Sequence, residues 1–325
     1  MSHNKPAFGF TVPQRAALFG VQPLADMVDL AAQADASGAF TSMWVGDSIL
    51  AKPRPESLTL LGALASATST VRLGVACMAS FPIRHPLVFA HQWATLDHLS
   101  RGRMDLAVCT GLVKERGASE REGTFFGVAD KQRVAKLEEN IAIIRALWAR
   151  DFSALPESAR RYTDVALDPQ PIQQPLPVWI AANAVPGRFY ERSLRRVATL
   201  ADGWMTVQHK PDRIAGLWKD LKALLIEEGR DPDTFPTLAY HNINVNPDRR
   251  AALAESKRFL DNYYGPVFSE SAVEAWTASG TPEQCAEQLA ALYNDGTKNI
   301  TLRITSWDQK DQLQRVINDV LPLIS

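Results

Sequence analysis

Val71-Arg-Leu-Gly-Val-Ala-Cys-Met78 is a nearly continuous apolar run of strand length, and it carries the clearest sign of the fold. A strand with one face in water alternates polar and apolar residues, whereas a strand covered on both faces is apolar almost throughout. Both faces of a parallel sheet are covered when helices pack on each side of it. The run therefore predicts a buried parallel sheet flanked by helices.

The same strand character recurs along the chain, and a segment of helical periodicity follows each strand. The eight predicted strands are Phe8–Val12, Thr41–Val45, Val71–Met78, Met104–Thr110, Val178–Asn183, Gly203–Val207, Thr237–Val245 and Asn299–Ile304. Eight right-handed crossovers close a parallel sheet into a barrel. The predicted fold class is therefore α/β, a single (β/α)8 TIM barrel with residues 1–325 as one domain. Active sites of this fold lie at the C-terminal ends of the strands.

Three segments exceed what a minimal barrel needs. They are insertions at Leu112–Asp130 after strand four, Asp151–Pro177 before strand five and Tyr263–Gly280 between strands seven and eight. Long irregular segments in a compact domain are usually functional or mobile. The first and third follow strands, so we expect them at the catalytic face, and the first is the predicted lid.

Composition and charge narrow the class of protein. The chain has 325 residues, of which 46% are hydrophobic and 22% charged, and its formal net charge is −1. This balance points to neither nucleic acid nor an anionic membrane as a partner, and no apolar run approaches the ~20 residues of a membrane span. Three scattered cysteines make no disulfide framework, no metal-ligand spacing occurs, and the first residues lack a signal peptide's apolar core. These features predict a reduced, cytoplasmic protein without a metal.

The segment Asn183-Ala-Val-Pro-Gly-Arg188 is a candidate phosphate site. No glycine-rich dinucleotide fingerprint or nucleotidase loop occurs in the chain. Free N–H groups at a helix start favour an anion, and Arg188 could pair with it through two hydrogen bonds. The alternative is that Asn183 caps the helix and Arg188 is a solvated helix residue.

Several short motifs, in order and at matching spacing over roughly residues 8 to 210, resemble the bacterial-luciferase-like family of flavin-dependent monooxygenases and oxidoreductases. The matching segments are Met43-Trp-Val-Gly-Asp-Ser48, Arg72-Leu-Gly74, Arg84-His-Pro86, Ala94-Thr-Leu-Asp-His-Leu-Ser-Arg-Gly-Arg103, Val108-Cys-Thr-Gly111, Phe126-Gly127 with Arg133, Pro169-Gln-Pro-Ile-Gln-Gln-Pro-Leu-Pro-Val-Trp-Ile180 and Ala201-Asp-Gly-Trp204. Each motif alone is weak, but together they are specific. The family's fold is the barrel that the strand pattern predicts.

The resemblance implies where the cofactor binds. In this family the isoalloxazine ring lies across the C-terminal mouth of the barrel. The cofactor-binding positions implied here are Asp47, Ala76, Cys77, Cys109, Thr110, Gly111, Asn183 and Arg188. The resemblance further implies a cis peptide bond between Ala76 and Cys77. Cys109 also has a structural interpretation, because a free cysteine is often a small buried residue.

The catalytic base is not identified by the sequence. Many deazaflavin-using members of the family have Asp-His where this chain has Asp47-Ser48. A serine does not accept a proton unaided at neutral pH, so this departure disfavours deazaflavin dehydrogenase chemistry but not a deazaflavin reductase. His209, after strand six, and His241, inside strand seven, are the candidates, although a histidine inside a strand is more often a core group.

The function implied by the resemblance is a flavin-dependent monooxygenase. It would use reduced FMN and O2 on a small organic substrate held at the mouth, where water is excluded. Such an enzyme could take its reduced flavin from a separate flavin reductase, and it could form a homo-oligomer. The alternative is an oxidoreductase that uses the deazaflavin coenzyme F420 on the same scaffold. A second alternative is a flavin-binding protein without catalytic activity.

Overall fold

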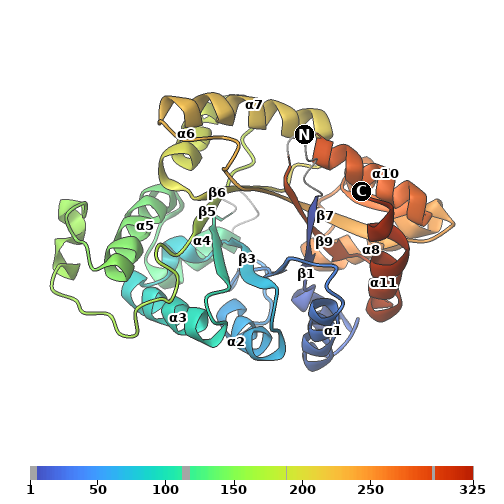
Figure 1. Ribbon diagram of the computed structural model, residues 1–325, viewed down its shortest axis with the longest axis horizontal. Helices are drawn as coiled ribbons and strands as arrows, with labels where there is room; N and C mark the ends of the chain where they lie inside the picture. Colours follow the sequence, from blue (N-terminus) through green and yellow to red (C-terminus); the bar gives the residue numbers. More distant parts are fainter. Residues whose placement is uncertain (1–5, 112–117, 188, 295–296, 325) are drawn as a thin grey trace.

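Eight parallel strands close into a barrel in the computed structural model, which describes residues 6–111, 118–187, 189–294 and 297–324 (Figure 1). One further strand, β8, spans Thr277–Gly280, and the eight barrel strands are β1 (Ala7–Thr11), β2 (Ser42–Val45), β3 (Arg72–Met78), β4 (Met104–Val108), β5 (Val178–Ala181), β6 (Gly203–Thr206), β7 (Thr237–Val245) and β9 (Asn299–Ile304). They follow the order β6-β5-β4-β3-β2-β1-β9-β7, and pairing of β6 with β7 closes the ring. The predicted TIM barrel is confirmed, with each of the eight predicted strands in place.

The ninth strand, β8, lies outside the barrel and was not predicted. It pairs in parallel with the last four residues of β7, from Asn242 opposite Thr277 to Val245 opposite Gly280. The same stretch had been expected to be an irregular insertion. Its sequence, Thr-Ala-Ser-Gly, is short, and Thr277 is its only β-branched or aromatic residue, so the pattern gave no signal.

Helices surround the strands on the outside of the barrel (Figure 1). They are α1 (Leu24–Ala36), α2 (Ser57–Ala67), α3 (Pro86–Leu99), α4 (Ala118–Phe126), α5 (Arg133–Ala149), α6 (Tyr190–Leu200), α7 (Pro211–Glu227), α8 (Arg249–Tyr264), α9 (Glu270–Ala275), α10 (Pro282–Asn294) and α11 (Gln309–Arg315). Short 3-10 helices span Gln14–Phe19, Phe81–Ile83, Asp130–Gln132, Glu157–Tyr162 and Leu321–Leu323, and a π turn spans Val316–Val320. None of the helices in the described ranges is both long and apolar enough to cross a membrane.

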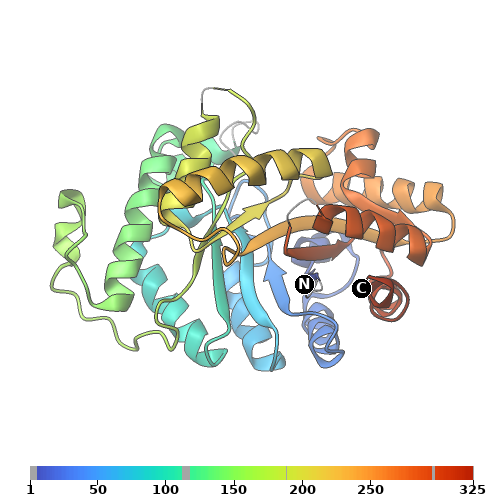
Figure 2. The ribbon, with the colours of Figure 1, turned by 45° about the horizontal axis from the view of Figure 1, so that its top comes forward.

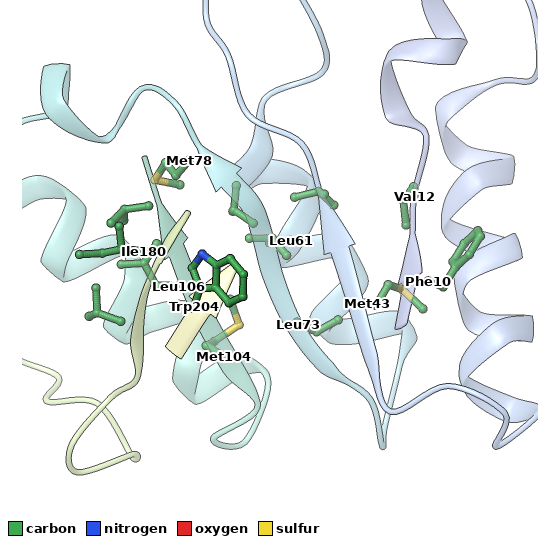
Figure 3. Packing of buried hydrophobic residues seen from close by; sticks show 14 of the residues in the cluster. Phe10, Val12, Met43, Leu61, Leu73, Met78, Met104, Leu106, Ile180 and Trp204 are labelled. Atoms are coloured by element: carbon green, nitrogen blue, oxygen red, sulfur yellow. The ribbon is translucent and has the colours of Figure 1, made fainter. Parts of the chain in front are cut away.

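The barrel has an outer core between strands and helices. Side chains such as Phe10, Met43 and Leu73 point outward from the strands and are almost fully buried (Figure 3). On the far side of the barrel Trp204 stacks on Trp218 of α7 with a ring separation of 6.2 Å. Because every strand is covered by a helix in this way, its sequence is apolar on the outer face.

A second core fills the barrel interior, and two tryptophans dominate it. Trp44 on β2 and Trp179 on β5 lie with ring centres 6.1 Å apart. Glycines on the adjoining strands make room for them. A Cβ at Gly74 would lie 2.4 Å from the Trp44 ring, and one at Gly203 would lie 2.5 Å from the Trp179 ring. Any side chain at either position would displace a ring from the interior.

An ion pair lies toward the N-terminal end of this interior. Arg72 donates from Nε and Nη2 to the two carboxylate oxygens of Asp105, at 2.5 and 2.7 Å. Burial raises the pKa of Asp105, although Arg72 opposes the rise. Gln173 accepts a further hydrogen bond from Arg72 at 2.9 Å. Arg72, Asp105 and Gln173 therefore line a pocket at this end of the barrel, opposite the expected site.

The predicted insertions contain ordered elements. The first contains α4, and its residues 112–117 lie outside the described residues. The second reaches the N-terminal end of the barrel through Gln173. Its short helix, Glu157–Tyr162, lies at the outer edge of the molecule beside α5 (Figures 1 and 2). The third contains α9 and β8.

Asp35, near the end of α1, holds the chain as it enters β3. Its carboxylate accepts hydrogen bonds from the backbone N–H groups of Ser69, Thr70 and Val71 at 2.6, 3.1 and 2.9 Å. Burial raises the pKa of Asp35, but these bonds and the Thr70 hydroxyl outweigh it and lower the pKa to about 2. The ionised carboxylate therefore stabilises the start of the strand that leads to the mouth.

We predict that Asp35→Asn lowers the free energy of unfolding at pH 7 by about 1–2 kcal/mol, after allowance for solvent screening. Because the folded pKa is depressed, this stabilisation is present above about pH 4 and is lost as the pH falls towards 2. Urea unfolding of the two proteins should therefore converge in that range. Asp29→Asn, at an exposed position on the same helix, is the control, and equal losses for both variants would contradict the prediction.

Candidate active site

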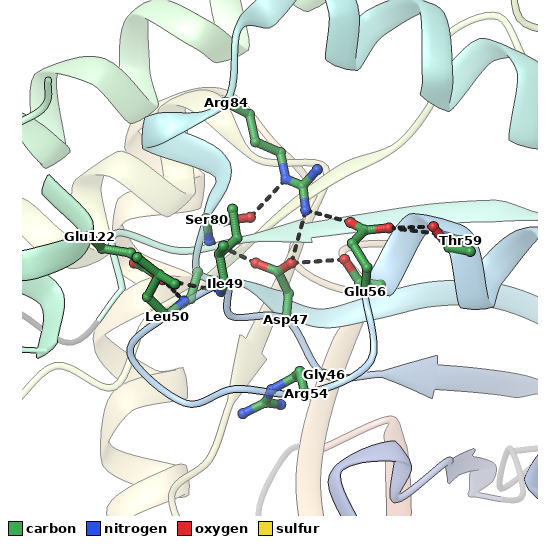
Figure 4. Close-up of polar contacts among 12 residues, drawn as sticks. Gly46, Asp47, Ile49, Leu50, Arg54, Glu56, Thr59, Ser80, Arg84 and Glu122 are labelled. Carbon is green, nitrogen blue, oxygen red and sulfur yellow. Dashed lines mark hydrogen bonds and ion pairs between the residues drawn. The ribbon is translucent and has the colours of Figure 1, made fainter. Parts of the chain in front are cut away.

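Asp47, directly after β2, is the centre of a buried polar network at the mouth (Figure 4). Its Oδ1 accepts hydrogen bonds from the Ser57 hydroxyl at 2.8 Å and from Arg84 Nη2 at 3.2 Å. Its Oδ2 accepts from the backbone N–H of Ser80 at 2.7 Å. Arg84 also binds Glu56 at 2.8 Å. Asp47 thus joins the loops that follow β2 and β3, and its carboxylate is already neutralised by an arginine.

Glu122 on α4 holds the loop after β2 from the other side. Its Oε1 accepts hydrogen bonds from three consecutive backbone N–H groups, those of Ile49, Leu50 and Ala51, at 3.1, 2.8 and 3.3 Å. Its Oε2 lies 3.1 Å from Nη2 of Arg133, and both side chains are buried. No local sequence pattern indicates this role, because it depends on contacts between residues far apart in the chain.

The ends of β3 and β4 meet at two cysteines. The peptide bond between Ala76 and Cys77 is cis, as the family resemblance implied. A hydrogen bond between the thiols of Cys77 and Cys109, together with burial, raises the pKa of Cys77 well above its ordinary value. Cys77 is therefore a neutral thiol at physiological pH and a poor nucleophile.

Arg133 ties this region together. Its Nη1 donates to the carbonyl oxygens of Ala79 and Thr110, each at 3.3 Å, so it bridges the loops after β3 and β4. Gly111 has a φ of 74°, and a Cβ there would lie 2.8 Å from Arg133 Nη1. The predicted positions at the ends of β2, β3 and β4 are thus brought together into one contiguous surface.

The candidate phosphate segment lies farther along the mouth. Asn183, after β5, uses its side-chain oxygen to accept bonds from the Thr206 hydroxyl and the Val207 N–H, at 2.9 and 2.7 Å. It therefore joins the ends of β5 and β6. Arg188 lies outside the described residues, and α6 begins two residues later, at Tyr190. A role for this segment in phosphate binding stays a prediction.

Neither candidate histidine has the properties of a strong base. Burial, and then the charge of Lys210, lowers the pKa of His209. Burial, and then the neighbouring His209, lowers the pKa of His241 to about 3. Strand alternation places His241 on the opposite face of β7 from Tyr240, which points into the barrel. A neutral imidazole of such low pKa has little tendency to accept a proton.

The side of the mouth over β7 and β9 is aromatic and contains a buried cation. Arg303 on β9 is fully buried and donates to Oδ1 of Asn242 from Nε and Nη2, at 3.0 and 2.7 Å. Its Nη1 donates to the Tyr264 hydroxyl at 2.6 Å. Four aromatic rings lie around its guanidinium carbon, with centroids at 4.6–5.4 Å: Tyr240, Tyr263, Tyr264 and Trp276. An arginine near the C-terminal end of a predicted strand was the available sequence signal.

The surface at the ends of β3, β4 and β5 fits a flat cofactor ring. Its side chains are no larger than threonine, and most are partly exposed: Ala76, Cys77, Cys109, Thr110, Gly111, Ala181 and Ala182. None of these seven side chains carries a charge, so the surface suits a neutral ring. In the described ranges no group of three or more histidine, cysteine, aspartate or glutamate side chains is placed to hold a metal ion.

Comparison with known proteins gives the family. A family model described as luciferase-like monooxygenase matches residues 7–299. The chain belongs to the luciferase-like monooxygenase family. This membership confirms the resemblance inferred from the motifs and accords with a mouth built from the ends of β2 to β5.

Curated relatives of the luciferase-like chain include enzymes that use coenzyme F420. The F420-dependent glucose-6-phosphate dehydrogenase of Amycolatopsis mediterranei is 25% identical over 329 residues, which cover 91% of this chain and 93% of that enzyme. An uncharacterized protein of Mycobacterium tuberculosis is 30% identical over 196 residues. That match covers 60% of this chain, which spans 64% of the length of the relative.

Solved structures share the fold of the luciferase-like chain. An F420-dependent secondary alcohol dehydrogenase superposes with a TM-score of 0.80 at 17% identity, covering 99% of both chains. A monooxygenase from Streptomyces bottropensis gives the same TM-score at 18% identity, covering 98% of this chain and all of its own. Enzymes named for F420 and for oxygen chemistry therefore have this same barrel.

We predict that His241 makes the luciferase-like protein less stable in mild acid. Below about pH 6.5 the unfolded state binds a proton that the folded state, with a His241 pKa of about 3, does not bind. The free energy of unfolding should therefore fall by about 1.5 kcal/mol between pH 6.5 and pH 5.

Urea unfolding at several pH values checks this dependence. His241→Gln should flatten the curve in that range, whatever its effect at pH 7. His91→Gln, at an exposed position on α3, should leave the slope as it is in the unaltered protein. A slope that is the same in all three proteins would refute the assignment to His241.

Proposed function

We propose that this protein is an oxidoreductase that uses coenzyme F420 to reduce a small organic substrate at the mouth of the barrel. The similarity to an F420-dependent dehydrogenase along 91% of the chain carries the proposal. The fold of an F420-dependent alcohol dehydrogenase supports it. The direction of reduction follows from Ser48, which stands where a catalytic base would accept a proton in a dehydrogenase.

The small side chains at the ends of β3, β4 and β5 would hold the ring. When bound, the deazaflavin supplies a hydride. Trp44, Ala76 and Trp179 belong to the interior cluster on which Cys77 and Tyr264 both pack. The ring surface and the aromatic side of the mouth therefore rest on the same buried cluster. An apolar floor excludes water from the substrate.

Tyr264 would supply the proton that a reduction also needs. Its hydroxyl oxygen accepts a hydrogen bond from Arg303, which leaves its own O–H free to donate to a substrate atom. Burial raises the pKa of Tyr264, but the charges of Arg303 and Arg54 outweigh it and lower the pKa below its ordinary value. Tyr264 is therefore a stronger acid than a tyrosine in water.

A flavin-dependent monooxygenase that uses reduced FMN and O2 is the second candidate function. The family description supports it, as does the shared fold of a diketocamphane monooxygenase solved with FMN. The two functions require the same surface at the ends of β3 to β5. They differ in the cofactor and in the need for oxygen.

The cofactor can be tested by titrating the purified full chain with F420, FMN and riboflavin, each oxidised and reduced, while following fluorescence. We expect F420 to bind at least tenfold more tightly than FMN. Tighter binding of FMN, with oxygen consumed during turnover, would favour the monooxygenase. Binding of a cofactor without reaction on any panel of ketones, enones and aldehydes would favour a binding protein.

We expect Tyr264→Phe to slow reduction of an accepted substrate by about 10²-fold or more, the range of general acid catalysis. Single-turnover rates with reduced F420 measure the step directly. The variant should also lose the fall in rate that the unaltered enzyme shows when Tyr264 ionises at high pH. Tyr293→Phe, a partly exposed tyrosine on α10, is the control. Equal rates for Tyr264→Phe and the unaltered enzyme would exclude this proton donor.

A further inference from the structure

Three arginines at the mouth have no carboxylate partner among the described residues. Arg303 binds only an amide oxygen and a phenol. Arg54, in the loop after β2, donates from Nε to the carbonyl of Lys52 at 3.2 Å and makes no ion pair within the described ranges. Arg15, in the 3-10 helix after β1, has a buried Nη1 with no hydrogen-bond partner. Buried cations in proteins are ordinarily paired.

These arginines converge on one pair of aromatic side chains. The guanidinium carbons of Arg54 and Arg303 lie 5.7 and 4.6 Å from the centre of the Tyr263 ring. Burial, and then the charge of Arg54, lowers the pKa of Arg15, while Tyr263 and Tyr264 act in the opposite sense. The ends of β1, β2 and β9 thus bring three like charges to the same place.

Nearby acidic residues are bound elsewhere. Asp47 and Glu56, on the same loop as Arg54, both pair with Arg84. Figure 4 shows the Arg54 guanidinium beside Gly46, turned away from both carboxylates. A Cβ at Gly46 would lie 2.0 Å from Arg54 Nη1, so the glycine permits this position. Arg54 therefore lies against the backbone of this loop and makes no ion pair within the described ranges.

We propose that Arg15 and Arg54, with the buried Arg303 beneath them, bind the oxyanion of a carboxylate or phosphate group at the mouth. The aromatic side chains around Arg303 would contact the apolar body of the same ligand. The oxyanion belongs either to the substrate, which would then be a small organic acid or phosphate ester, or to the cofactor. Two guanidinium groups are well suited to such a group, because each can donate two parallel hydrogen bonds. The substrate class rests on the oxidoreductase function proposed above.

Calorimetric titration of the full chain with inorganic phosphate and with benzoate tests the site without any cofactor. We expect one of these anions to bind, with a dissociation constant that rises with salt. Arg54→Gln and Arg15→Gln should each weaken binding about tenfold or more, the effect of losing one charge-assisted hydrogen bond. Arg54→Lys should lose less affinity than Arg54→Gln, because it keeps the charge but not the two parallel hydrogen bonds.

Arg213→Gln, at an exposed position on α7, is the matched control and should bind as the unaltered protein does. The proposal fails if the unaltered protein binds neither anion, or if the control weakens binding as much as Arg54→Gln. It also fails if Arg54→Gln and Arg15→Gln both bind normally. Melting curves establish that each variant is folded, so a loss of binding is read as a property of the site.

Titration of the same variants with FMN and riboflavin identifies the source of the oxyanion. If Arg54→Gln weakens FMN binding but not riboflavin binding, the site holds the cofactor phosphate. If both flavins bind normally while phosphate or benzoate binding is lost, the site holds a substrate group. The titrations with phosphate and benzoate contain no cofactor. The anion site can therefore be refuted even if F420 binds, and it can be supported even if F420 does not bind.

Discussion

The inside of the barrel must be filled, and the rest of the structure depends on how this is done. Trp44 and Trp179 occupy the interior. Gly74 and Gly203, on neighbouring strands, lie against their rings. Arg72 and Asp105 form an ion pair nearer the N-terminal end. These large side chains fill the middle of the barrel, and the loops that carry the candidate site lie beyond them, at the C-terminal ends of the strands. The location of the site is therefore a result of packing as much as of topology.

The mouth divides into two chemically different halves. Over β3, β4 and β5 the side chains are small and neutral. Asp47 and Arg133 join the loops there through hydrogen bonds to backbone groups such as the Ser80 N–H and the Thr110 carbonyl. Over β1, β7 and β9 the side chains are aromatic, and their positive charge is not matched by carboxylates in the described ranges. A neutral ring and a polar or anionic partner would each have a suitable half. A reaction between a cofactor and a substrate needs both molecules held side by side, and the two halves of the mouth would provide a place for each.

The sequence predicted features that depend on local pattern. Strand positions followed from apolar runs such as Val71–Met78, and the cis bond at Ala76–Cys77 followed from a motif. It did not predict β8, which has one strand-favouring residue in four and pairs with the part of β7 that extends past β6. Nor did it predict the contacts of Glu122 or Arg303. Their partners lie tens of residues away, and pairing of that kind depends on the completed fold, whereas periodicity reports only which face of an element is buried.

Glu122 contacts residues 49–51 through their backbone N–H groups alone. The path of this loop is therefore fixed without any demand on which side chains it carries. Leu50 is exposed, and Lys52 and Arg54 follow within the same loop. During evolution these positions can change one at a time, altering what the mouth recognises, while the loop keeps its course and the barrel keeps its stability. An arrangement of this kind lets a lineage acquire new substrates by point mutation, with no need to rebuild the scaffold.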